Sequence, residues 1–155
     1  AGCYAVYATR FVMSAEPVEV IGMSHDSGNW GIDTTFSGVM KFANGAISNI
    51  TTNMEQPFRC FITIDGSKGR IEIPGMFEDS GPIIIKRGDG RNGERSETIA
   101  TPAPYRFVVQ FDEFSECVLT GKKPEFPAAD GLRNTAVIEA LYKSAETGSP
   151  VSLDL

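Results

Sequence analysis

The stretch that decides the fold is residues 32–54, IDTTFSGVMKFANGAISNITTNM. In its first half, Phe36 and Met40 lie on one side of a period-two pattern, which is typical of a β-strand with two different faces. Asn44 and Gly45 follow, a pair suited to a two-residue type I′ turn because both residues tolerate positive φ. The chain then returns as a second strand, so the stretch predicts an antiparallel hairpin.

Further short runs rich in β-branched residues extend this hairpin into a sheet. They cover residues 18–23, 59–64, 70–73, 83–86 and 97–101. Most of the runs are joined by turns of hairpin length, and short connections imply antiparallel pairing. We therefore expect about six or seven strands, most of them antiparallel.

Three segments have the apolar spacing of amphipathic helices. Gly121 ends the second of these helices, whereas Asp130 caps the third, which ends at Gly148 and Pro150. We expect the stripe of the third helix to face the core. The three stripes are Tyr4, Tyr7 or Ala8, and Phe11; Phe107, Phe111, Phe114 and Val118; and Val137 or Ile138, Leu141 and Ala145.

The order of the elements is one helix, a run of strands, and two helices. Helices grouped outside an antiparallel run form an α+β fold with two layers, here a largely antiparallel open sheet with helices packed on one face. Strands that do not alternate with helices exclude a doubly wound nucleotide-binding fold. We expect residues 1–155 to form a single domain, and, because the chain starts inside a helical pattern, we expect Ala1 to be a cut edge.

The composition excludes several classes of protein. Hydrophobic residues make up 41% and charged residues 22% of the 155 residues, which is typical of a globular chain and not of a disordered one. The formal net charge of −6 provides no basic surface for phosphates, so we expect no nucleic-acid partner. No apolar run approaches the ~20 residues that span a bilayer, and no basic signal-peptide start is present. We therefore expect a soluble, cytoplasmic protein without a membrane partner.

The residues that most often bind metals or act as nucleophiles are few. Cys3, Cys60 and Cys117 form no Cys-x-x-Cys motif, and their odd number argues against a disulfide framework, so we interpret each as a small buried hydrophobic residue. His25 is the only histidine, and with Asp26 beside it offers too few ligands for a closed zinc site. We expect a solvated loop at this pair and no metal.

Residues 88–93 match the dinucleotide-binding pattern G-x-G-x-x-G. That fingerprint functions because a helix N-terminus lies directly behind the glycines. Residues 94–99, which follow, have no helical apolar stripe. We interpret the segment as a hairpin loop and expect no cofactor site there.

Several short motifs together resemble the C-terminal domain of the glucose–fructose oxidoreductase, inositol dehydrogenase and MocA family. They occur in the family's order and cover nearly the whole chain. The matching segments are Gly2-Cys3-Tyr4 with Thr9-Arg10, Gly31-Ile32-Asp33, residues 41–45, residues 65–71, residues 105–114, residues 121–124 and residues 144–148.

The resemblance implies an oxidoreductase that transfers hydride between NAD or NADP and a sugar, cyclitol or related diol. In this family an N-terminal Rossmann domain, absent from this chain, binds most of the cofactor, so we expect the chain alone to be inactive and to bind no cofactor tightly. The alternative that the sequence leaves open is a binding or scaffold module that shares the fold and has no catalytic activity.

The resemblance also implies roles for individual residues. Tyr4 matches the His or Tyr of the family's catalytic motif, whose Asp would precede Ala1, and is expected to be the acid/base. A phenol, with a reference pKa near 10, is a poor base at neutral pH unless a cation favours phenolate, and in this family a lysine of the N-terminal domain supplies that cation. Tyr105 and Phe77 match positions of substrate-pocket aromatics. Both also suit plain core packing, and for Phe77 we favour the interpretation as a core residue. Arg10 is assigned a structural role only.

The family's sheet typically packs against another copy through its open face. Here Phe36 and Met40 on one face leave Thr35 and Val39 on the other, and neither of these is charged. An apolar-to-neutral exposed sheet face of this kind is suited to a protein partner. We expect a homodimer or tetramer that assembles through this face.

Overall fold

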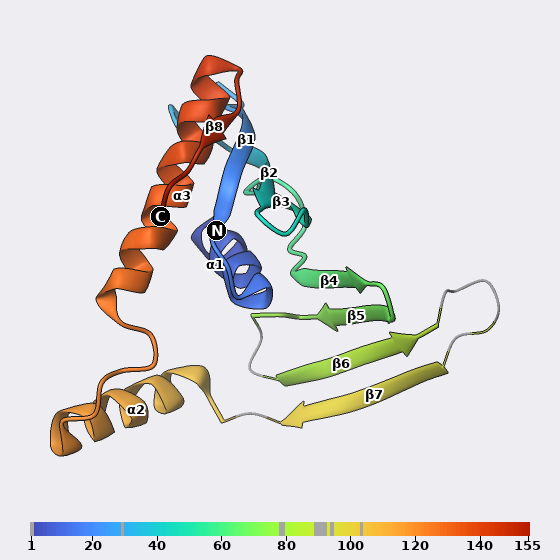
Figure 1. Cartoon of the computed structure of the whole chain (residues 1–155), viewed down its shortest axis with the longest axis vertical. Coiled ribbons are helices and arrows are strands. Elements are labelled where there is room, and N and C mark those ends of the chain that lie inside the picture. The colour runs from blue at the N-terminus through green and yellow to red at the C-terminus, as the bar shows by residue number, and fades with distance from the viewer. Residues whose placement is uncertain (1, 29, 78–79, 89–92, 94, 103) are drawn as a thin grey trace. The chain divides into compact units, whose positions relative to one another are not determined.

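The structure is a computed structural model that describes all residues except 1, 29, 78–79, 89–92, 94 and 103. It divides into two compact units, which are described separately: unit 1 contains residues 1–56 and 125–155, and unit 2 contains residues 57–124. The elements are α1 (Gly2–Met13), β1 (Pro17–His25), β2 (Thr35–Phe42), β3 (Ile47–Asn53), β4 (Phe61–Gly66), β5 (Gly69–Pro74), β6 (Ser80–Arg87), β7 (Arg95–Pro102), α2 (Arg106–Thr120), α3 (Ala128–Thr147) and β8 (Val151–Ser152) (Figure 1).

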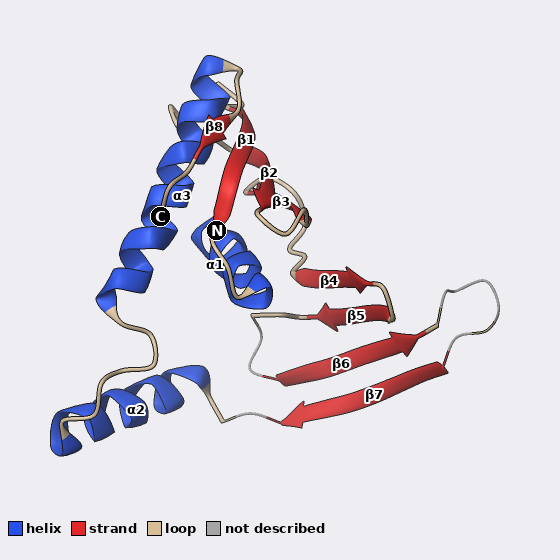
Figure 2. Ribbon diagram, viewed as in Figure 1, coloured by secondary structure: helices blue, strands red, loops and turns tan. Residues whose placement is uncertain are grey.

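The predicted α+β class with antiparallel strands is confirmed. The strands of the described residues are divided between two four-stranded sheets, in the order β3-β2-β1-β8 in unit 1 and β4-β5-β6-β7 in unit 2 (Figure 2). Every pair of neighbouring strands is antiparallel. The strand β8 was not predicted, because a run of two residues carries no period-two pattern.

The core of unit 1 lies between its sheet and the helices α1 and α3. The alternation predicted for the central hairpin is confirmed, because Phe36 and Met40 are buried whereas Thr35 and Val39 point to the other face. The stripe predicted for the last helix is confirmed as well, since Val137 and Leu141 face the same core. The buried cluster consists of Val6, Val20, Phe36, Met40, Phe42, Ile50, Val137, Ala140 and Leu141.

Two glycines allow α3 to approach the sheet closely. A Cβ atom added to Gly22 of β1 would lie 2.4 Å from the carbonyl oxygen of Leu141, and one added to Gly38 of β2 would lie 2.8 Å from the Leu141 side chain. Both distances are shorter than van der Waals contact. The helix can therefore lie across the sheet at this depth only because the two strands have no side chain at these positions.

The turn between β2 and β3 differs from the predicted type I′ turn. Gly45 has a φ of +85°, but Asn44 does not have a positive φ. The N–H of Gly45 donates to the carbonyl of Phe42 at 2.9 Å, and the N–H of Phe42 donates to the carbonyl of Ala46 at 2.9 Å. Asn44 and Gly45 therefore form the hairpin through a three-residue loop in which only the glycine needs the left-handed conformation.

The helices α1 and α3 differ from the sequence-based predictions in the buried side of α1 and in the first residues of α3. In α1 the buried side is formed by Val6, Ala8, Thr9 and Arg10, whereas Tyr4 and Phe11 of the predicted stripe are exposed. The helix α3 begins after Pro127, so Asp130 lies in its first turn and is not the N-cap. Gly148 ends α3 in the left-handed conformation, as predicted.

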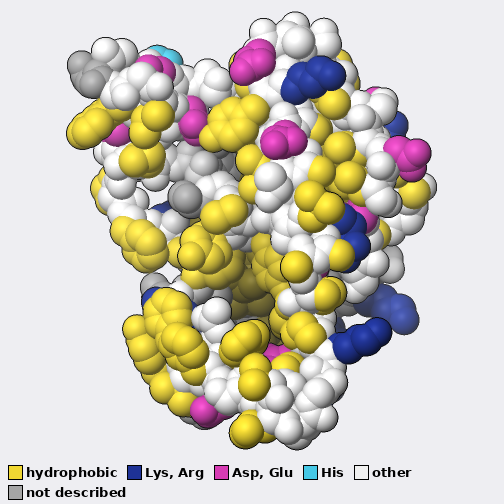
Figure 3. All heavy atoms as spheres, turned by 90° about the vertical axis from the view of Figure 1, so that its left-hand side faces the viewer, with side chains coloured by type: hydrophobic (Ala, Val, Ile, Leu, Met, Phe, Trp, Pro, Cys, Tyr) yellow, Lys and Arg dark blue, Asp and Glu magenta, His cyan; other side chains and the backbone are white. Residues whose placement is uncertain are grey.

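Unit 2 contains the second sheet and α2. The predicted strands 59–64, 70–73, 83–86 and 97–101 correspond to β4, β5, β6 and β7. Gly121 ends α2 as predicted, with a φ of 73°. The stripe of Phe107, Phe111, Phe114 and Val118 is exposed, however, and hydrophobic side chains lie at the surface in the lower part of Figure 3, where α2 lies. No helix among the described residues is long and apolar enough to span a membrane.

Candidate functional site

Tyr4, the predicted catalytic residue, lies in the first turn of α1 with 60% of its surface exposed. Its helix places it away from the core because of the 3.6-residue period. Val6 follows two residues later, about 200° further around the helix, and is fully buried against the sheet. The Tyr4 phenol is therefore accessible to a small molecule and does not pack in the core of unit 1.

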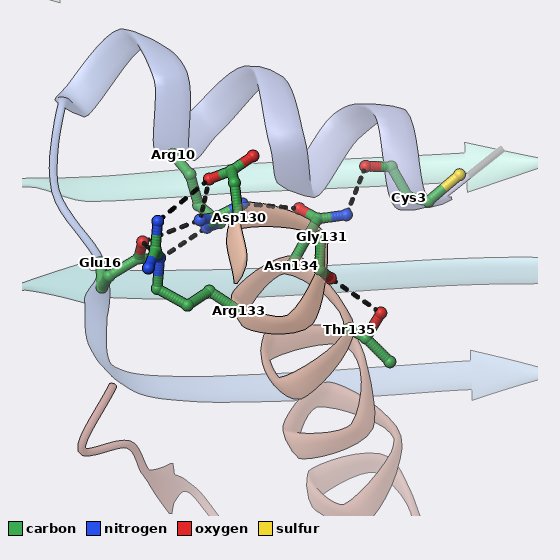
Figure 4. A network of polar contacts seen from close by, with 8 residues as sticks. All are labelled: Cys3, Arg10, Glu16, Asp130, Gly131, Arg133, Asn134 and Thr135. Carbon is green, nitrogen blue, oxygen red and sulfur yellow. Dashed lines mark hydrogen bonds and ion pairs between the residues drawn. The ribbon is translucent and has the colours of Figure 1, made fainter. Parts of the chain in front are cut away.

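A buried arginine holds α1 in place. The Arg10 side chain is 4% exposed and forms two hydrogen bonds with Glu16, from Nε to Oε2 at 2.6 Å and from Nη2 to Oε1 at 2.8 Å (Figure 4). Nη2 also donates to Asp130 Oδ1 at 2.8 Å. The hydrogen bonds from Arg10 raise its own pKa further and hold the pKa of the Glu16 carboxyl below its usual value. Both groups are therefore charged at neutral pH.

Asn134 extends this network to the turn that carries Tyr4. Its Oδ1 accepts a hydrogen bond from Arg10 Nη1 at 3.2 Å, and its Nδ2 donates to the carbonyl of Cys3 at 3.3 Å (Figure 4). The residue next to Tyr4 is thus tied directly to α3. The network of Arg10, Glu16, Asp130 and Asn134 fixes both ends of α1 and with them the position from which the Tyr4 phenol projects.

Sequence reasoning assigned Arg10 a structural role but missed its partners. Glu16, Asp130 and Asn134 are separated from Arg10 by 6, 120 and 124 positions. No local pattern relates residues so far apart. The available signal was weak: an arginine on a helix otherwise rich in apolar residues requires buried acidic partners.

Tyr105 and Phe77 are brought to the same region of unit 2. Tyr105 is the residue before α2, and its ring contacts that of Phe107 edge-on at 5.3 Å. Arg106, the first residue of α2, donates from Nη1 to the carbonyl of Phe77 at 2.7 Å. Tyr105 is 54% exposed and Phe77 38% exposed, so the interpretation of Phe77 as a core residue is wrong for the described structure. Two aromatic surfaces are available to a ligand at this end of unit 2.

The remaining candidates do not form a site. Cys117 is buried as predicted, but Cys60 is only half-buried and Cys3 is exposed, so burial does not explain all three thiols. In the loop after β1, Asp26 accepts a hydrogen bond from the Gly28 N–H at 3.0 Å. The described residues contain no cluster of three or more His, Cys, Asp or Glu side chains suited to a metal ion.

The glycine-rich segment 88–93 falls largely outside the described residues. Gly88 follows the last residue of β6, and Gly93 precedes β7 by two positions. The segment therefore connects two paired strands. The strand β7 begins at Arg95, shortly after the segment, and the predicted hairpin loop itself lies largely outside the described residues.

The chain is similar to known oxidoreductases along its length. The family model of the oxidoreductase family's C-terminal alpha/beta domain matches residues 1–153. The chain is 30% identical over 156 residues to D-xylose 1-dehydrogenase (NADP(+)) 2 of Haloferax volcanii, an alignment that covers 99% of this chain and 46% of the relative. It is 22% identical to D-xylose 1-dehydrogenase [NADP(+)] of Haloarcula marismortui, covering 99% of this chain and 42% of the relative.

A solved structure supports the same relationship. The aldose-aldose oxidoreductase of Caulobacter crescentus, crystallised with glycerol, superposes with a TM-score of 0.83 at 28% identity, covering 98% of this chain and 46% of the other. The chain thus spans slightly less than half the length of each of these relatives. It belongs to the Gfo/Idh/MocA oxidoreductase family, and it corresponds to the family's C-terminal α/β domain.

Proposed function

We propose that this chain is the substrate-binding half of an NADP-dependent oxidoreductase that transfers hydride to or from a sugar or a related polyol. The observation that carries the proposal is the 30% identity with a D-xylose 1-dehydrogenase over 99% of the chain. The proposed partner half is a cofactor-binding domain outside these residues, since the chain covers only 46% of that relative's length.

In this proposal Tyr4 moves the proton that accompanies the hydride. Oxidation of a carbinol requires a base that accepts the hydroxyl proton, and reduction requires an acid that returns it. The phenol of Tyr4 can do both, provided that a cation near it favours the phenolate. NADP, when bound, accepts or supplies the hydride. The network around Arg10 and Asn134 keeps the phenol in a fixed position while the proton moves.

The whole protein that contains this chain tests the proposal directly. We expect NADP-dependent oxidation of D-xylose or another aldose, followed by the near-ultraviolet absorbance of the reduced nicotinamide. The matched control is the 155-residue chain alone, which we expect to give no turnover. Absence of any nicotinamide-dependent reaction with aldoses, alditols and cyclitols would instead support a binding module without catalytic activity.

We further propose that Tyr105 or Phe77 forms part of the surface that holds the substrate. An aromatic face packs well against the C–H groups of a sugar ring, and both rings are partly exposed at one end of unit 2. In the whole protein we expect Tyr105→Ala to raise KM by roughly tenfold, equivalent to about 1.4 kcal/mol of binding, with a smaller change in kcat. An unchanged KM in both Tyr105→Ala and Phe77→Ala would contradict this role.

We also propose that the outer face of the unit 1 sheet binds a second copy of the chain. The pairing of β1, β2 and β3 places Ile21, Met23, Val39 and Ile47 on this face, and Met23 is 75% exposed. Apolar side chains exposed together on one sheet face are typical of an interface. Dimers or tetramers assembled in this way would leave α1 and α3 on the opposite side.

Light scattering tests the assembly. We expect the wild-type protein to have the mass of a dimer or a tetramer and Met23→Asp to shift it towards the monomer, because a carboxylate would be buried without a partner. Leu132→Asp, which places the same charge at an exposed position on α3, is the control and should leave the mass unchanged. A monomeric wild-type protein at high concentration would refute the proposed interface.

A further inference from the structure

Asn134 connects the Arg10 network to the first turn of α1 through the two ends of one amide. The residue lies in the second turn of α3, and its half-buried side chain points towards α1 (Figure 4). Oδ1 accepts from Arg10 Nη1 at 3.2 Å, and Nδ2 donates to the carbonyl of Cys3 at 3.3 Å. Of the four network residues, all of which the structure describes, Asn134 alone is hydrogen-bonded to this turn.

The chemistry of its two neighbours fixes the direction in which the Asn134 amide points. A guanidinium group offers donors and no acceptor, whereas a carbonyl oxygen offers lone pairs and no donor. Turning the amide over would place its NH2 group against Arg10 and its oxygen against the Cys3 oxygen, so two hydrogen bonds would become two repulsive contacts. Arg10 therefore keeps the Nδ2 donor directed at the Cys3 carbonyl.

The Cys3 carbonyl belongs to the peptide group that also contains the nitrogen of Tyr4. A peptide group is planar, so a bond that holds its oxygen also restrains the orientation of the bond entering the Tyr4 Cα atom. The helical pattern of α1 directs the N–H of residue 7 to the same oxygen, whose second lone pair accepts from Asn134. Asn134 thus acts on the backbone from which the Tyr4 side chain projects.

The charged part of the network lies too far along α1 to restrain this turn by itself. Arg10 follows Tyr4 by six residues, which corresponds to about 9 Å along the helix axis. Its bonds to Glu16 and Asp130 therefore hold the C-terminal half of α1. The amide of Asn134 extends the restraint to the turn that carries the phenol.

We propose that Asn134 is a positioning residue for Tyr4: Arg10 orients its amide, and the amide fixes the peptide group that precedes the tyrosine. This inference rests on the proposed function of Tyr4 as the acid/base. The two ends of the amide then have separate effects. Oδ1 contributes to the stability of the contact between α1 and α3, whereas Nδ2 contributes to the rate of proton transfer, which is sensitive to the position of the transferring group.

Asn134→Asp separates these two effects because it exchanges only the NH2 group of the side chain for an oxygen. Aspartate keeps an acceptor for Arg10, but it has no donor for the Cys3 carbonyl, and its second oxygen repels that carbonyl. In the whole protein we expect kcat to fall by roughly 10- to 10²-fold while KM stays near the wild-type value. We expect the free energy of unfolding to fall by less than in Arg10→Met.

Two control variants leave the amide of Asn134 intact. Thr9→Val removes a hydroxyl that contacts Ser48 Oγ of β3 at 3.2 Å, so it weakens the attachment of α1 at another point. Asn44→Asp makes the same chemical change in the turn between β2 and β3, where the side-chain oxygen accepts from the Ala46 N–H at 3.0 Å. Both variants should keep the wild-type kcat.

The double variant Tyr4→Phe/Asn134→Asp tests whether Asn134 acts through Tyr4. We expect its kcat to equal that of Tyr4→Phe, because the position of a ring without a hydroxyl no longer affects proton transfer. A merely structural role would instead lower the kcat of Tyr4→Phe by the same factor as it lowers that of the wild type.

Three results would overturn the positioning role: a wild-type kcat in Asn134→Asp, a similar loss of kcat in either control variant, or a double variant slower than Tyr4→Phe. The proposed function fails in a different way. If Tyr4→Phe itself kept the wild-type kcat, the acid/base role would be refuted, and the positioning role with it. A loss of kcat in Tyr4→Phe but not in Asn134→Asp would refute the positioning role alone.

Discussion

Tyr4→Phe in the whole protein is expected to lower kcat/KM by roughly 10²–10⁴-fold, the range that a positioned acid or base contributes. The substitution removes the oxygen that would exchange a proton with the substrate but keeps the aromatic ring. Tyr4 is largely exposed and lies outside the buried core, so the free energy of unfolding should change little. Steady-state kinetics with the preferred sugar, together with urea denaturation, measure both quantities.

Tyr7→Phe is the matched control for this experiment. It makes the same chemical change three residues further along α1, where the Tyr7 ring packs against Phe126 at 6.0 Å and against Phe11 at 6.3 Å. These ring contacts do not require the hydroxyl, so we expect kcat/KM to remain near the wild-type value. Wild-type kcat/KM in Tyr4→Phe, or an equal loss in Tyr7→Phe, would show that Tyr4 is not the acid/base.

Arg10→Met is expected to destabilise the fold by about 3 kcal/mol, at the lower end of the range for removing one partner of a buried ion pair. The substitution leaves the carboxylates of Glu16 and Asp130 half-buried and facing one another. Arg133 limits this loss of stability, because its positive charge stays close to both carboxylates. Its Nε lies 3.0 Å from Glu16 Oε1, and its Nη2 lies 3.6 Å from Asp130 Oδ1. Urea or thermal unfolding monitored by circular dichroism measures the change.

Arg70→Met provides the comparison for Arg10→Met. Arg70 forms an equally short ion pair, 2.6 Å from Nε to Asp65 Oδ1, but on an exposed hairpin of unit 2. Solvent screens such a pair, so its loss should cost less than about 1 kcal/mol. A similar loss in the free energy of unfolding of the two variants would contradict the inference that burial makes the Arg10 network more stabilising than an exposed ion pair.

The same network predicts how stability depends on pH. The hydrogen bond and charge of Arg10 hold the pKa of Glu16 below its ordinary value of 4.5 in the folded state. The stability that this shift contributes is therefore fully present above pH 4.5 and is lost as the pH falls through the lowered pKa. Glu16→Gln should remove this part of the acid dependence, which unfolding curves measured at several acidic pH values would show.

The fold was predictable wherever the burial of an element depends on its own sequence. The period-two pattern around Phe36 and Met40 matches the buried face of β2, because adjacent side chains of a strand point to opposite faces. The stripe containing Val137 and Leu141 similarly matches the buried side of α3. For α1 the apolar stripe did not identify the buried side, because Tyr4 and Phe11 are exposed and Arg10, a charged residue, is buried instead.

The residues of the candidate sites were predictable to different degrees. Tyr4, Tyr105 and Phe77 came from the resemblance to a family, since an isolated tyrosine or phenylalanine has no local signature of catalysis or binding. The contact between Asp33 and Tyr142 had no signal in the sequence. Asp33 and Tyr142 are 109 positions apart, and their hydrogen bond exists only because α3 returns over the strands of unit 1.

The amino-acid sequence by itself determined the α+β class, the antiparallel hairpins, the inward face of the central strands and the family, because each of these is recorded in local periodicity or in the order of short motifs. Only the tertiary structure decided which side of α1 is buried, that Arg10 binds Glu16, Asp130 and Asn134, and that Tyr142 donates a hydrogen bond to Asp33. Those outcomes depend on contacts between segments far apart in the chain, where the favourable pairing of a buried charge can outweigh the hydrophobic pattern of a single helix.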